Sequence, residues 1–201
     1  MLRKILLLSL IAISAFALNR GEININDKDL EVSAKFDIGQ LNPAVEPDTT
    51  FIGLKFLKAD KSHADTTYKS FDPFYEANFL MMRSIGNSGM KMGLGMKLNA
   101  TKNFVSMPLG VEFSYKMPLR GYVKMYLNGE LYYAPTVLTF RDGDNFLEYR
   151  LSYDIELIKN GALTLGYRSL DTNYKVAKGY GVNGGDFNYN SFWYVGFKIG
   201  F

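Results

Sequence analysis

The chain has a single histidine, His63, in a polar segment that also contains Asp60, Lys61 and Asp65. A histidine beside a carboxylate can activate water, so this segment is one candidate for hydrolytic chemistry. The chain has no second histidine and no cysteine, which argues against a transition-metal site. A solvated loop histidine is the simpler interpretation, and a hydrolase stays only as a second alternative.

The segment Asp142-Gly143-Asp144-Asn145 is rich in oxygen ligands and resembles part of a calcium-binding loop. It lacks the closing bidentate glutamate at loop spacing, so a glycine-containing turn is the preferred interpretation. The chain has neither a phosphate-binding glycine loop nor a G-x-S-x-G nucleophile motif. We therefore predict no catalytic residue, no metal site and no cofactor.

The remaining charged residues alternate with apolar ones, and this alternation predicts the elements that position them. One face of the last segment carries Trp193, Val195, Phe197, Ile199 and Phe201. The other face carries Phe192, Tyr194, Gly196, Lys198 and Gly200. A period of two is typical of a strand whose two faces meet different environments.

The same alternation recurs along the chain and predicts about ten strands, most of them about 8–12 residues long, which is enough to span a bilayer when tilted. The predicted strands are 22–26, 30–38, 50–57, 74–82, 90–98, 107–117, 123–133, 146–157, 162–168 and 192–201. The predicted fold is all-β, a single transmembrane antiparallel up-and-down β-barrel. Eight strands are also possible, because segment 22–26 is short.

The predicted connections differ in length on the two sides of the sheet. Links 58–73, 135–145 and 170–188 are long and polar, whereas 86–89, 118–121 and 159–161 are tight. Long loops on one side and short turns on the other are typical of outer-membrane barrels, whose short turns face the periplasm. The strands of a soluble β-sandwich also alternate between apolar and polar residues. A sandwich would not, however, place aromatic residues near strand ends on one face and charges of both signs at strand centres on the other.

The first residues have the features of a signal peptide. Arg3 and Lys4 precede an apolar run over 5–13, and Ala15 and Ala17 form an A-x-A cleavage site. We predict a signal-peptide helix at 1–17 and an outer-membrane barrel at 18–201. Cleavage would leave 21 of the 23 basic residues against 20 acidic ones, a net charge of +1 that indicates no nucleic-acid partner.

Two resemblances extend this interpretation. Phe201, at the end of the alternating aromatic strand, resembles the C-terminal signal that the barrel-assembly machinery of bacterial outer membranes recognises; periplasmic chaperones and membrane lipid would be further partners. The segments 129–135 (GELYYAP), 145–150 (NFLEYR) and 166–170 (GYRSL) resemble the YfaZ family of predicted outer-membrane proteins, and 36–57 resembles its variants in campylobacter-type bacteria. This resemblance implies an outer-membrane location and a barrel, without implying a reaction.

Charged residues on the second face of the strands are the main candidate site. The side chains predicted to face the lumen are Glu112, Lys116, Lys124, Glu130, Glu148, Arg150, Asp154, Glu156, Arg168 and Lys198. Neighbouring strands should bring Arg168 near Glu148, Arg150 and Glu156, and Lys124 near Glu112. These charges either form ladders that fill a narrow barrel or line a small water-filled path.

The sequence therefore predicts a monomeric, non-catalytic barrel of the bacterial outer membrane with a structural, surface or narrow-pore role. One alternative is a surface adhesin or receptor that binds through loops 58–73 and 170–188. A second is a membrane-embedded hydrolase that uses His63.

Overall fold

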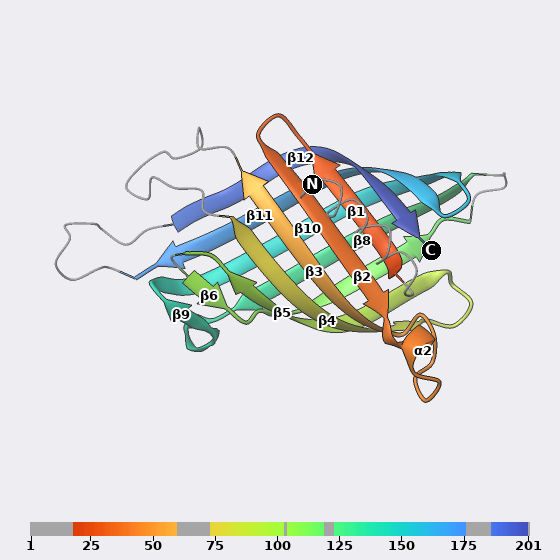
Figure 1. Ribbon diagram of the computed structural model, residues 1–201, viewed down its shortest axis with the longest axis horizontal. Coiled ribbons are helices and arrows are strands. Elements are labelled where there is room, and N and C mark those ends of the chain that lie inside the picture. The colour runs from red at the N-terminus through yellow and green to blue at the C-terminus, as the bar shows by residue number, and fades with distance from the viewer. Residues whose placement is uncertain (1–17, 60–72, 103, 119–122, 176–185, 201) are drawn as a thin grey trace, which may run out of the picture.

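The computed structural model describes residues 18–59, 73–102, 104–118, 123–175 and 186–200, and the predicted signal peptide, Phe201 and His63 lie outside them. Ten long antiparallel strands form a closed barrel, because every strand pairs with two neighbours and β4 also pairs with β5 (Figure 1). The strands are β1 (Leu18–Ile25), β2 (Asp29–Asp37), β3 (Thr50–Ala59), β4 (Phe74–Ser84), β5 (Met90–Ala100), β7 (Leu109–Lys116), β8 (Lys124–Ala134), β10 (Gly143–Ile158), β11 (Gly161–Tyr174) and β12 (Asp186–Gly200). The predicted all-β fold with one antiparallel barrel is confirmed, and the barrel has ten long strands rather than eight.

Two short strands were not predicted. β6 (Phe104–Ser106) pairs with the end of β5 and with β9 (Thr139–Arg141), which follows the 3-10 helix η2 (Thr136–Leu138). The predicted strand 107–117 begins only at Leu109, because the chain first forms β6 and then passes through Met107 and Pro108. Arg141 Nη1 donates to the carbonyl oxygens of Thr101 and Lys102, at 3.3 and 3.0 Å. These two hydrogen bonds hold β9 against the link between β5 and β6.

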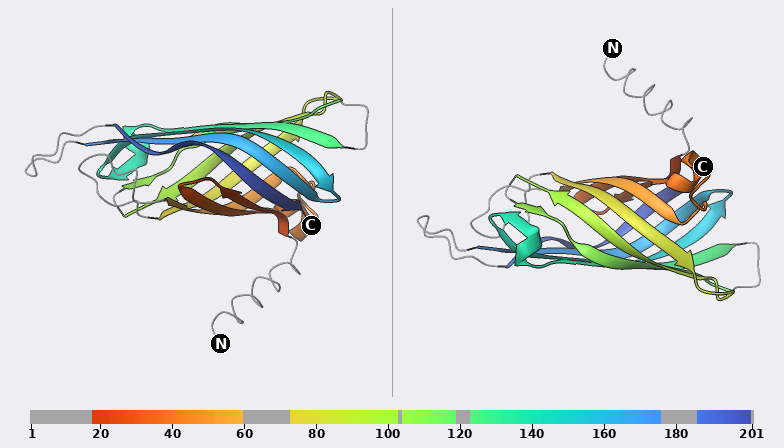
Figure 2. Two further views of the ribbon diagram at one scale, coloured as in Figure 1. Left: turned by 90° about the horizontal axis from the view of Figure 1, so that it is seen from above. Right: turned by 90° about the horizontal axis from the view of Figure 1, so that it is seen from below.

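The barrel has two unlike ends, as Figures 1 and 2 show. β6, β9 and the ends of β3 and β11 lie at one end, which we call the loop end. The start of β1, the end of β12 and the short helix α2 (Ile38–Leu41) lie at the other, the turn end. α2 occupies the unusually long turn between β2 and β3, where Asp37 caps it by accepting a hydrogen bond from Gly39 N at 2.9 Å.

Three strands extend farther toward the loop end than predicted. β10 begins at Gly143, β11 continues to Tyr174, and β12 begins at Asp186. Most of the predicted loop 135–145 is therefore strand or short helix, and so are residues 170–174 and 186–188 of the predicted loop 170–188. Among the described residues, no helix is long and apolar enough to cross a membrane.

Alternation along each strand gives the barrel an apolar outside and a polar inside. In β4 the buried positions are Phe74, Glu76, Asn78, Leu80 and Met82, and the residues between them are exposed. The buried side chains of the barrel include Arg168, Lys97, Glu31 and Glu148, each at most 1% exposed. Since side chains alternate across a strand, a face that points into the barrel on one strand continues onto its neighbours through the register.

Glycine residues allow one inward tyrosine to lie flat against the wall. Tyr132 of β8 covers Gly110 of β7 and Gly95 of β5, where any Cβ atom would overlap the tyrosine ring. Its hydroxyl donates to Glu112 Oε1 at 2.7 Å, and Lys97 Nζ lies 4.0 Å from the ring centroid. The small residues therefore position an aromatic surface for the charged groups of the lumen.

Candidate functional site

The ten side chains predicted to face the lumen lie at inward positions of β7, β8, β10, β11 and β12. Glu112, Glu148, Arg150, Asp154 and Arg168 are buried, and Glu130, Glu156 and Lys198 are partly buried. Lys116 and Lys124 are exposed, because they lie near the turn end of β7 and β8.

The predicted ion pairs are wrong in their partners. Lys124 pairs with Glu156 at 2.8 Å, its direct neighbour in the register between β8 and β10, and not with Glu112. The acidic partners of Arg168 are Asp29 and Glu31 of β2, rather than Glu148 or Glu156 of β10. The register places Arg150 directly beside Arg168, so these two cations need a carboxylate from elsewhere.

The most important missed residue is Glu31, which joins both arginines across the lumen. Arg150 Nη2 donates to Glu31 Oε1 at 2.5 Å and to Oε2 at 2.7 Å, and Arg168 Nη1 donates to Oε2. Arg168 Nη2 also donates to Asp29 Oδ1 at 2.9 Å. The Tyr194 ring lies 5.4 Å from the Arg150 guanidinium carbon and 5.5 Å from that of Arg168. A bidentate carboxylate and an aromatic face together hold two guanidinium groups away from water.

A second group of charges lies beside the first and is centred on two lysines. Lys55 Nζ lies 2.5 Å from Glu76 Oε2 and 2.7 Å from Glu148 Oε1. Lys97 Nζ lies 2.9 Å from Glu148 Oε2, 3.1 Å from Glu130 Oε2 and 3.6 Å from Glu76 Oε2. Two ammonium groups and two fully buried carboxylates thus alternate, so that each charge has an opposite charge beside it.

We call these two groups together the ionic layer, comprising Glu31, Lys55, Glu76, Lys97, Glu148, Arg150 and Arg168. The sequence contained a signal for the missed members, because Glu31, Lys55, Glu76 and Lys97 also alternate with apolar neighbours in the first half of the chain. The layer links the two halves of the barrel by side chains rather than by backbone pairing.

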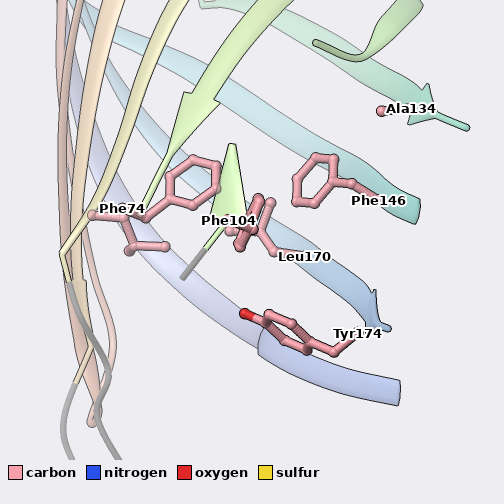
Figure 3. Packing of buried hydrophobic residues seen from close by; sticks show 7 residues of the cluster. Phe74, Phe104, Ala134, Phe146, Leu170 and Tyr174 are labelled. Carbon is pink, nitrogen blue, oxygen red and sulfur yellow. The ribbon is translucent and has the colours of Figure 1, made fainter. Parts of the chain in front are cut away.

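An aromatic cluster lies on the loop-end side of the ionic layer. It contains Leu57, Phe74, Phe104, Ala134, Phe146, Leu170 and Tyr174, and we call it the aromatic cap. Four of its members are the next inward residues beyond Lys55, Glu76, Glu148 and Arg168 on their strands. Phe104 comes from β6, and its ring centroid lies 5.8 Å from that of Phe146 and 6.4 Å from that of Phe74. Figure 3 shows these side chains converging inside the wall.

On the opposite side of the ionic layer, the barrel contains a cavity of about 570 Å³, which we call the chamber. Its lining includes Gly86, Gly89, Asn160 and Gly200, so it opens at the turn end. Lys35 reaches from β2 to Glu112 of β7 at 2.9 Å, and Lys198 of β12 lies 2.8 Å from Asp154 of β10. The lumen is thus filled toward the loop end and hollow toward the turn end.

The structure describes one of the two segments that the sequence analysis considered and set aside, Asp142–Asn145, but not the one around His63. Among the described residues, no group of three or more His, Cys, Asp or Glu side chains could hold a metal ion. Asn145 Oδ1 accepts a hydrogen bond from Asn173 Nδ2 at 3.1 Å across β10 and β11, while Gly143 and Asp144 begin β10. Asp142 therefore lies in the turn between β9 and β10, and the rest of the segment begins β10. Ala15, Ala17, His63 and Phe201 lie outside the described residues.

The outward face of β12 carries Trp193, Val195, Phe197 and Ile199, each at least 38% exposed. These are the described members of the segment that resembles an assembly signal. No family model, curated protein or solved structure matches the chain.

Proposed function

We propose that the chain is a non-catalytic barrel of the bacterial outer membrane, with a structural or surface role and a lumen that does not conduct. One observation carries the membrane part of this proposal. Each of the ten long strands exposes at least two large apolar side chains, while the barrel interior holds the charges. A continuous apolar belt of this kind is far larger than the patches that soluble monomers expose. Lipid would cover it, as in other transmembrane barrels.

At the loop end the inward face of the wall becomes mostly apolar and the outward face becomes polar. This reversal supports the proposal that the lipid-covered belt ends there. Beyond Arg168, the inward residues of β11 are Leu170, Thr172 and Tyr174, while Asp171 and Asn173 face outward. Tyr75 and Tyr133 are exposed at the same end, 54% and 49% respectively. A mostly apolar interior and a polar exterior suit a segment in water, and outward tyrosines suit the membrane interface just below that segment. On this basis the loop end faces the cell exterior.

Replacing Leu94 by arginine tests whether lipid covers the belt. Leu94 lies at the centre of β5 and is 71% exposed, so a water-facing residue there would tolerate the change within about 0.5 kcal/mol. In a bilayer we expect a loss of about 2–4 kcal/mol in the free energy of unfolding, because the charge would lie near the midplane. Urea unfolding in lipid vesicles measures the difference.

The matched control is Val137→Arg, since Val137 is 79% exposed but lies in η2 at the loop end. We expect this variant to unfold with the wild-type free energy. If the two arginine variants were equally stable, lipid would not cover β5 and the membrane proposal would fail.

The filled half of the lumen supports a closed barrel rather than a narrow pore. We expect folded wild-type protein to give no stepwise conductance in planar bilayers, because the ionic layer and the aromatic cap lie in series across the lumen. A 16-stranded porin in the same bilayers serves as the positive control. Reproducible steps from protein shown to be folded by its altered migration on unheated gels would instead support the narrow-pore function.

The resemblance to the YfaZ family is compatible with this proposal and rests on the sequence segments quoted above. An adhesin or receptor is the second candidate, favoured by the extension of β10, β11 and β12 at the loop end. Most of the loops it would use, at 60–72 and 176–185, lie outside the described residues. Deleting them should abolish binding to cells while the barrel still assembles.

A further inference from the structure

The chamber has the dimensions and chemistry of a ligand site rather than of an unfilled barrel end. Its volume of about 570 Å³ lies within the range of about 300–1,000 Å³ that is usual for small-molecule sites. The ionic layer forms its floor, and it opens at the turn end. It therefore differs from a channel in having one entrance, and its existence does not depend on the proposed function.

The charges of the chamber are balanced. Acidic and basic side chains line it in equal numbers. Lys35, Lys198, Glu22 and Glu130 are the four partly buried ones near the floor, with side chains 16–25% exposed. They leave some charged surface open to the cavity in addition to their ion pairs. A ligand with a net charge would upset this balance, whereas a zwitterion would find an opposite charge for each of its ends.

One wall of the chamber is apolar. Phe51 of β3 and Leu80 and Met82 of β4 form a small cluster that also lines the cavity. Across the chamber, Asn128, Ser152 and Asp154 line the wall from β8 and β10. A ligand that carries an apolar group on one side of a polar head matches this division.

Two side chains at the floor retain polar atoms without a hydrogen-bond partner. These atoms are Asn78 Oδ1 and Arg150 Nε, in residues that are each 7% exposed and line the chamber. One accepts and the other donates. Buried polar atoms in folded proteins usually bind water or a ligand when the protein provides no partner.

We propose that the chamber binds a small zwitterion with an apolar group, of the size of an amino acid or dipeptide, that enters from the turn end. Lys35 and Lys198 face its carboxylate, Glu22 and Glu130 face its ammonium group, and the Phe51 cluster contacts its apolar group. On the proposed membrane orientation the ligand comes from the periplasm.

The test uses L-phenylalanine as the probe and methionine methyl signals as the reporter, with the full mature chain in lipid nanodiscs. Met82 and Met90 line the chamber, whereas Met92 and Met96 are exposed on the outside of β5. We expect saturable shifts of the first two methyl signals and none of the other two. Phenylacetate and phenethylamine each lack one charged end, and we expect each to bind at least about tenfold more weakly, the change that corresponds to one lost charged contact.

Lys35→Met is the decisive variant, and Lys124→Met is its matched control. Each lysine pairs with one glutamate, at 2.9 and 2.8 Å, but Lys124 is exposed and does not line the chamber. We expect Lys35→Met to weaken L-phenylalanine binding at least about tenfold and Lys124→Met to change it less than about twofold.

Three outcomes would overturn the proposal. The first is the absence of saturable shifts at Met82 and Met90, which would mean that the chamber holds only water. The second is equal binding of the three probes, and the third is an equal effect of the two lysine variants on binding. The dispersion of the methyl spectrum shows in each case whether the variant has folded. Because the readout is ligand binding, a negative result here leaves the membrane test on Leu94 unaffected.

Discussion

Glu31→Ala should lower the free energy of unfolding by about 3–5 kcal/mol, the usual cost of removing one partner from a buried ion pair. Glu31 is fully buried and accepts hydrogen bonds from both Arg150 and Arg168. Without it, the carboxylate contacts left to the two adjacent guanidinium groups among the described residues are Arg150 with Glu22, at 3.5 Å, and Arg168 with Asp29, at 2.9 Å. Urea unfolding in detergent micelles, followed by Trp193 fluorescence, measures the loss.

Two further variants separate the lost ion pair from a general effect of the substitution. Glu46→Ala removes an exposed glutamate in the turn between β2 and β3, and we expect it to change stability by less than about 0.5 kcal/mol. The double variant Glu31→Leu/Arg150→Met removes Glu31 and one of its two arginines, while Arg168 keeps Asp29. It should recover part of the loss, because apolar replacements of a buried pair are often nearly neutral. If Glu31→Ala were as stable as Glu46→Ala, the ionic layer would contribute nothing to folding.

Most of the fold could be predicted from the sequence because its two faces differ in chemistry. The alternation of apolar and polar residues over 90–98 or 146–157 can be recognised within each segment alone. It predicts the bounds of β5 and β10 to within a few residues. The loop end was harder to predict. Leu170 and Tyr174 point inward while their neighbours Asp171 and Asn173 point outward, so the pattern reverses where the proposed lipid belt ends. Because the outer face is polar there, the sequence pattern predicts a loop.

The candidate site was predicted only in part, for a geometric reason. Alternation shows which side chains face inward, but it does not give the register between strands or the width of the lumen. Arg168 reaches Glu31 from a strand that is separated from β2 by β12 and β1. Phe104 reaches the lumen from a strand of three residues, too short to alternate visibly. Such contacts depend on closure of the barrel, which sequence spacing alone does not describe.

Phe104→Ala should lower the free energy of unfolding by about 3–5 kcal/mol, as expected for truncation of a fully buried phenylalanine that leaves a cavity. Phe104 contacts Phe74, Phe146 and Tyr174, so its loss affects three rings from three other strands. We also expect the variant to give no stepwise conductance in planar bilayers. The ionic layer is one inward position closer to the turn end and does not depend on Phe104 for any of its ion pairs.

The matched control is Phe140→Ala in β9, which faces β6 in the register but is 46% exposed. We expect it to cost less than about 1 kcal/mol, because little of its surface is buried. Urea unfolding of both variants in micelles, with conductance recorded from the same preparations, separates two roles of the loop end. Equal stability of the two variants would show that β6 does not insert Phe104 into the lumen. Stepwise conductance of Phe104→Ala would show that the aromatic cap alone closes the barrel, since the ionic layer, still intact, would then be permeable to ions.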